Sequence, residues 1–163
     1  MRILKRLYSA RKKREYKGGR PSRAARLQNR LWSWVFGAGL MGSRAAVLEV
    51  VGRTTGRLVS LPVAVVTLDG ERYLVSMLGD DTNWVRNVRA ASGNARLRHG
   101  RAEDVILVQD LSDKRAEILR RYVSIAPGAR PHVPVDRREP VEAFQMIVDQ
   151  FPVFRITIGP TPR

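Results

Sequence analysis

The chain has 163 residues, which is long enough for one domain that buries a core without help from metals or disulfides. It lacks cysteine, and this excludes thiol catalysis, disulfides and cysteine-ligated metals. The two histidines, His99 and His132, show no metal-ligand spacing, so no metal site is expected. Of the formal net charge of +15, a net +11 lies in residues 1–30, where 12 Lys and Arg residues accompany only Glu15.

The N-terminal segment is strongly basic. We expect residues 1–21 to be a flexible arm ahead of a single domain over residues 22–163. No secretion signal or membrane-spanning stretch is visible, so the expected location is the cytoplasm. The pattern after Ser22 predicts an amphipathic helix that ends among the glycines of residues 37–42. Its apolar face consists of Leu27, Leu31, Trp34, Val35 and Ala38.

This basic helix has three interpretations. The commonest fate of such an apolar stripe is packing on the domain's own core. In a second interpretation, residues 1–35 hold the protein against an anionic membrane surface, on the inner face of the cell membrane, with Trp32 and Trp34 near the lipid headgroups. Contact with nucleic-acid phosphates ranks last, because the arm has no groove-reading or RNA-stacking motif.

The remainder of the chain predicts short strands joined by tight turns, with helices inserted among them. The expected strands are residues 45–51, 58–68, 71–78, 95–99, 102–111 and 152–158. The expected helices are residues 83–91, 112–124 and 140–150. Pro62 predicts an edge position or a bulge for its strand, Asp69-Gly70 predicts a tight turn, and Thr82 is a candidate helix cap.

These elements do not alternate as βαβ units. The hairpins instead predict an α+β fold in which about six mostly antiparallel strands close, or nearly close, into a small barrel. The N-terminal amphipathic helix and two or three further helices lie around it.

The polar turn at residues 52–56, with the sequence GRTTG, is the first candidate site. Its glycines permit unusual backbone angles, and it offers N–H groups, two hydroxyls and a guanidinium, which together suit an anion such as phosphate. An ordinary polar hairpin loop is the alternative. No activated nucleophile accompanies it: nothing marks Ser76 as activated, and Asp80-Asp81 is explained by the dipole of the following helix. Any difficult chemistry therefore belongs to a bound cofactor.

The order of motifs between residues 44 and 158 resembles the deazaflavin-dependent nitroreductase and quinone reductase family, whose hydride carrier is coenzyme F420. That family has a GR(K/R)(S/T)G turn, a run ending in proline, a glycine-bearing loop, and the pattern W-x-x-N-L-(R/K)-A. The corresponding parts here are GRTTG at 52–56, Pro62, Gly79 and NWVRNVRA at 83–90. The segment FPVFRI at 151–156 is similar to the family's closing strand.

The resemblance implies a split β-barrel, of the kind that also binds FMN, with the cofactor's acidic end at the turn and its ring at the loop and helix. The residues implied to hold the phosphate and acidic tail are Arg53, Thr54, Thr55, Gly56 and Arg57. The residues implied to surround the ring are Pro62, Met77, Leu78, Gly79, Trp84 and Asn87. The implied activity is hydride transfer from reduced F420 to a planar acceptor such as a quinone or a nitroaromatic compound.

The chain departs from the family in its charges. The family commonly has basic residues where this sequence has Thr54, Val59, Ser60 and Leu78. Fewer positive charges are therefore available to bind the acidic tail of F420. FMN is accordingly the alternative cofactor. The alternative function is a non-catalytic split barrel that binds a flavin-like or fatty ligand and associates with membranes through its basic N-terminus. Barrels of this kind often pair, so a homodimer is a further expectation.

Overall fold

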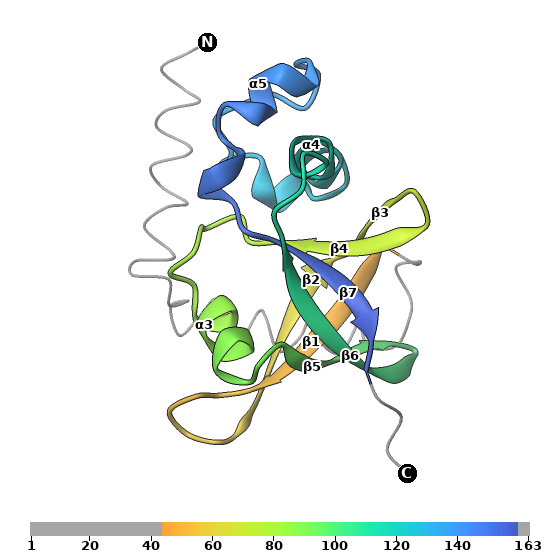
Figure 1. Ribbon diagram of the computed structural model, residues 1–163, viewed down its shortest axis with the longest axis vertical. Helices are drawn as coiled ribbons and strands as arrows, with labels where there is room; N and C mark the ends of the chain where they lie inside the picture. The colour runs from red at the N-terminus through yellow and green to blue at the C-terminus, as the bar shows by residue number, and fades with distance from the viewer. Residues whose placement is uncertain (1–43, 160–163) are drawn as a thin grey trace.

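The computed structural model describes residues 44–159, which form a seven-stranded antiparallel sheet curled into a half-barrel with α-helices around it (Figure 1). The strands are β1 (Ala45–Val51), β2 (Leu58–Ala64), β3 (Val66–Leu68), β4 (Glu71–Val75), β5 (Asn94–His99), β6 (Arg101–Asp110) and β7 (Val153–Ile158). The helices of this part of the chain are α3 (Asn83–Ala90), α4 (Arg115–Ile125) and α5 (Val141–Gln145), with 3₁₀ turns η2 (Pro127–Ala129) and η3 (Val148–Gln150). The helix expected after Ser22 lies outside the described residues.

The strand order is β2-β1-β5-β6-β7-β4-β3. The single strand predicted over residues 58–68 is wrong, because the chain breaks at Val65, whose N–H donates to the carbonyl of Arg44 at 2.8 Å. β2 and β3 therefore occupy opposite edges of the sheet although only one residue separates them. The sheet must curl to allow this, which gives seven strands and confirms the expected split barrel.

Two sequence signals at the sheet edges are confirmed. Pro62 lies in the edge strand β2, opposite Val47 of β1, where its missing N–H removes no bond to an outer neighbour. Asp69 and Gly70 form the turn between β3 and β4 with φ of 52° and 78°. Positive φ at both central residues matches the twist of the flanking strands, and this is why Asp-Gly predicts a tight hairpin.

Side chains on the two faces of the sheet enter two different core clusters. We name the two clusters after the helices that pack in them, the α3 cluster and the α4 cluster. Leu74 of β4 belongs to the α3 cluster, whereas its neighbours Tyr73 and Val75 belong to the α4 cluster on the other face. The α3 cluster consists of Ala46, Leu48, Val50, Val65, Leu74, Val85, Val88, Leu97, Val105, Leu107, Phe154 and Ile156. The α4 cluster is built largely from α4, α5 and the ends of β3, β4 and β7. In Figure 1, α3 lies well apart from α4 and α5.

Two elements are shorter than the sequence predicts. The strand expected to reach residue 78 ends at Val75, and residues 76–82 form a loop. The helix expected over residues 140–150 ends at Gln145, because the N–H of Ile147 bonds to the carbonyl of Phe144, three residues back. The chain then tightens into η3 before it enters β7.

Candidate functional site

The turn at residues 52–57 joins β1 to β2 and is closed by its own backbone. The N–H of Gly52 donates to the carbonyl of Arg57, and the N–H of Gly56 donates to the carbonyl of Gly52, both at 2.8 Å. A Cβ at Gly52 would lie 3.1 Å from Thr55 Oγ1 and 3.2 Å from the Arg57 carbonyl, so a larger residue there would fit only if these neighbours shifted. The predicted tail-binding residues 53–57 are all exposed.

The closed turn presents hydrogen-bond donors to its surroundings. The backbone N–H groups of Thr54 and Thr55 form no hydrogen bond with another described residue. Arg53 and Arg57 likewise form no ion pair with any carboxylate of residues 44–159. Two consecutive amides beside two uncompensated guanidinium groups can bind an anion.

Helix α3 lies directly against this turn. The side-chain oxygen of Asn87 accepts two hydrogen bonds from Arg53, one from its backbone N–H at 3.2 Å and one from Nη1 at 2.8 Å. Nη2 of Arg53 makes a longer contact of 3.5 Å with Asn83, one helical turn earlier. Two motifs more than thirty residues apart in the sequence are thus joined through one arginine.

The loop at residues 76–82 leads from β4 into α3, and its shape is set by a buried serine. The hydroxyl of Ser76 donates to the carbonyl of Gly79 at 2.7 Å and lies 3.2 Å from the hydroxyl of Thr82. Thr82 is the N-cap residue of α3, as the sequence predicts, and its carbonyl accepts from the N–H of Arg86 at 3.1 Å, but its side chain forms no capping hydrogen bond with the helix. Gly79 has φ of 87°, a conformation that side chains oppose. The sequence around Ser76 shows no sign of an activated nucleophile, and it gives no signal of this structural role.

Ion pairs brace the same loop from outside. Arg89 of α3 donates to both oxygens of Asp80 at 2.6 and 2.7 Å and also to Gln109 of β6 at 3.0 Å. The hydrogen bond from Arg89 holds the pKa of Asp80 below its usual value. Arg86 pairs with Asp81 at 2.6 Å. These two acids therefore anchor arginines of α3, which sequence reasoning did not anticipate.

The residues predicted to surround a ring divide between the two faces of the sheet. Trp84 packs against the α3 cluster, with its ring 5.4 Å from that of Phe154. Met77 packs against the α4 cluster. Pro62 lies on the face of β2 opposite to Leu61, which packs with the α3 cluster. Leu78 and Gly79 are half-buried in the loop. The structure thus brings Arg53 to Asn87, but it does not place Pro62 beside Trp84.

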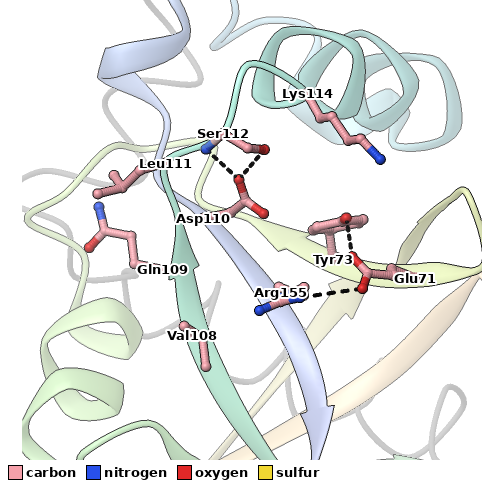
Figure 2. A pocket seen from close by; sticks show the side chains of 9 residues that line it. All are labelled: Glu71, Tyr73, Val108, Gln109, Asp110, Leu111, Ser112, Lys114 and Arg155. Carbon is pink, nitrogen blue, oxygen red and sulfur yellow. Dashed lines mark hydrogen bonds and ion pairs between the residues drawn. The ribbon is translucent and has the colours of Figure 1, made fainter.

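A separate cleft of about 340 Å³ lies between β4, β6, β7 and the start of α4 (Figure 2). Its two cations each meet a carboxylate: Arg155 pairs with Glu71 inside the cleft, and Lys114 pairs with Asp69 outside its lining. Glu71 accepts a hydrogen bond from the Tyr73 hydroxyl at 2.7 Å and one from Arg155 at 3.3 Å. Burial, followed by the bond to Glu71, raises the pKa of Tyr73 to about 12. None of the predicted cofactor residues lines this cleft, and no spacing in the sequence marks it.

The helices of the described residues are all too short or too polar to cross a membrane.

Comparisons with solved structures support the split-barrel fold. A putative pyridoxamine 5′-phosphate oxidase from Listeria innocua has a TM-score of 0.50 and 12% identity, with 82% of this chain and 94% of that chain covered. A domain-swapped dimer has a TM-score of 0.50 and 13% identity, with 80% and 94% covered. At such identities these two structures support the fold alone. No protein among those with curated functions matches the sequence.

A reductase that bears the name of the same coenzyme is also among the similar structures. The F420-H2 dependent reductase FDR-A has a TM-score of 0.47 and 16% identity, with 71% of this chain and 95% of that chain covered. The family model that matches residues 23–143 is described as F420H(2)-dependent quinone reductase. This match spans most of the chain and contains both motifs that meet at Arg53. The chain therefore belongs to the F420H(2)-dependent quinone reductase family, and it is an oxidoreductase that uses coenzyme F420.

Proposed function

We propose that this protein binds coenzyme F420 across the Arg53 turn and the adjoining loop and helix at residues 76–90, and reduces a planar acceptor, a quinone in the first instance. The hydrogen bonds from Arg53 to Asn87 carry the proposal, because they join the two motifs on which the family resemblance rests. When bound, the reduced coenzyme supplies a hydride, which together with a proton from solvent converts a quinone to a hydroquinone.

The residues at the turn fit the acidic end of such a coenzyme. Arg53 and Arg57 are uncompensated by described carboxylates, and the amides of Thr54 and Thr55 have no partner among residues 44–159. A guanidinium with adjacent N–H groups binds phosphate more specifically than an ammonium does. Fewer charges are present than the family commonly has, so the affinity for the tail depends strongly on these two arginines.

The residues at the loop and helix fit a flat, partly apolar ring. Gly79 exposes backbone close to the start of α3, and Trp84 is only partly buried. Ser76 inside the loop and Asp80 outside it hold this backbone in place before any ligand arrives. A preformed loop orients a ring at lower entropic cost than a mobile one.

Titration of the full chain with oxidised F420, followed by deazaflavin fluorescence, tests the cofactor. Consumption of F420H2 with a water-soluble naphthoquinone, and separately with a nitroaromatic compound, tests the acceptor. We expect saturable binding of F420 and faster turnover with the quinone. Binding of FMN in preference to F420 would reject the cofactor assignment, and turnover with the nitroaromatic alone would reject the quinone.

We further propose that residues 1–35 bring the protein to anionic membranes, where quinones dissolve. The concentration of 12 basic residues in the first 30 supports this proposal. Deletion of residues 1–30 should abolish pelleting with vesicles that contain phosphatidylserine, and should leave F420 affinity unchanged. Loss of F420 binding in the truncated chain would show that the two tasks are not separate.

A further inference from the structure

Asn87 is a polar side chain in a buried position on α3. Only 4% of the residue is exposed, and its amide oxygen is directed away from the helix to the turn that joins β1 and β2. The hydrogen bonds of this oxygen within the described residues come from Arg53 alone. Buried polar atoms are normally bonded, so Asn87 depends on Arg53 as much as Arg53 depends on Asn87.

The contact fixes the same arginine at two points. One oxygen accepts from the backbone N–H of Arg53, which sets the path of the turn, and from Nη1, which sets the direction of the side chain. Asn83 adds a third, longer contact to Nη2. A free arginine side chain occupies many rotamers, and a ligand must order it on binding. In this structure the contacts with Asn87 and Asn83 already favour one orientation of the Arg53 side chain.

The charge of the holding residue distinguishes Arg53 from the other arginines near α3. Arg86 pairs with Asp81 and Arg89 pairs with Asp80, both at 2.6 Å, so a carboxylate compensates each of those charges. Arg53 is held by amides, and no carboxylate among residues 44–159 pairs with it. An amide can orient a guanidinium without neutralising it.

We infer that Asn87 is a positioning residue that orients Arg53 toward an anionic group of the bound molecule while leaving its charge intact. The identity of that anion, the phosphate or carboxylate of F420, rests on the proposed function. The family resemblance implies that Asn87 lies beside the ring of the cofactor. Its hydrogen bonds in the structure instead connect it to Arg53, at the turn proposed to bind the acidic end of the cofactor. Asn87 acts on the ligand through Arg53.

The test is a double-mutant cycle on the full chain, with oxidised F420 as the probe and fluorescence titration as the measurement. Arg53→Ala and Asn87→Ala are made singly and together. Asn87→Ala should weaken binding about tenfold in the wild-type background, and by about twofold or less when Arg53 is already absent. Equal losses in both backgrounds would overturn the inference, because they would mean that Asn87 touches the ligand directly or supports only the fold.

Asn87→Asp separates orientation from charge. The carboxylate keeps an acceptor oxygen in place but compensates the guanidinium. F420 affinity should fall at least as far as in Asn87→Ala, and it should depend less on salt concentration than in the wild type. Unchanged affinity in Asn87→Asp would contradict the need for an uncharged holding residue.

Amide hydrogen exchange in the ligand-free chain tests the contact without any cofactor. The Arg53 N–H should be protected in the wild type and in Asn87→Asp, and it should exchange faster in Asn87→Ala. The N–H groups of Gly52 and Gly56 should stay protected, since backbone carbonyls accept from them. Failure of the wild type to bind F420 would reject the proposed function alone. An unchanged Arg53 rate in Asn87→Ala would reject the role of Asn87.

Discussion

The Arg53 turn and the cleft around Glu71 both present arginine to solvent, but their charges are arranged differently. In the cleft, Arg155 bonds to Glu71, and Lys114 pairs with Asp69. At the turn, no described carboxylate meets Arg53 or Arg57. A cleft whose two cations both meet carboxylates has little positive charge left to attract an anion, whereas an exposed turn with uncompensated arginines retains its positive charge. The shape of the described residues therefore directs attention to the cleft, whereas the balance of charge supports the proposed site at the turn.

The strongest test of this comparison removes one arginine from each region. Arg53→Ala should weaken F420 binding by about 1.5–3 kcal/mol, the range for hydrogen bonds to charged groups. Arg155→Ala, its matched control in the cleft, should leave the affinity unchanged. Both are measured by fluorescence titration at the same salt concentration, because screening acts on exposed charges. Equal losses in the two variants would remove the distinction between the regions.

A second variant tests the loop that leads from β4 into α3. Gly79→Ala forces a side chain into a φ of 87° and sets its Cβ 3.3 Å from the carbonyl of Gln150. The free energy of unfolding should fall by about 1 kcal/mol, and F420 affinity should fall with it. Gly128→Ala, where nothing lies within 4 Å of the new Cβ, is the control. Full affinity in Gly79→Ala would show that the loop conformation is not used for binding.

Glu71→Gln breaks the pairing inside the cleft while leaving the turn untouched. Glu71 contributes to the raised pKa of Tyr73 through a hydrogen bond and through its charge. Its replacement should therefore lower the Tyr73 pKa from about 12 toward 10, as followed by ultraviolet titration of tyrosine. F420 binding should not change. Weaker binding in this variant would mean that the cleft belongs to the cofactor site after all.

The last prediction is a pH dependence of stability from the same tyrosine, far above neutral pH. The pKa of Tyr73 in the folded protein, about 12, lies above its ordinary value of 10.0. Its contribution to stability is therefore complete below about pH 10 and is lost as the pH rises toward 12. Tyr73→Phe should flatten the decline of the unfolding free energy over this interval in urea denaturation. An unchanged slope would show that Tyr73 ionises equally easily in the folded and unfolded chain.

Much of the fold could be predicted because its signals are local. Asp69-Gly70 specifies a turn by backbone angles alone, and the apolar pattern of residues 45–51 matches β1 residue for residue. The break at Val65 could not be predicted, because an uninterrupted apolar run looks the same whether it stays in one strand or crosses between two sheet edges. The early end of the helix after Pro140 could not be predicted either, because the apolar periodicity of Val141, Phe144 and Val148 continues past Gln145, where the backbone changes to three-residue bonds.

The candidate site was predictable as two separate motifs, since the GRTTG turn and the segment around Trp84 each resemble a known pattern. Their meeting at Arg53 was not, because a hydrogen bond between residues 53 and 87 is a product of the folded sheet. The role of Ser76 in shaping the loop could not be predicted either, because a serine that bonds inside a loop and a serine on a surface look the same in the sequence. The division of Pro62 and Trp84 between two faces required the strand register.

The edge position of β2 has a consequence for how easily a protease can cut the folded protein. β2 is hydrogen-bonded to β1 alone, and every one of its side chains is at least partly exposed. Local opening favours segments with few partners, so within residues 44–159 this hairpin should be the first place where a protease cuts. A ligand bound at the tip of the hairpin would suppress its local opening. The rate of proteolysis would then fall as the fraction of protein with an occupied site rises.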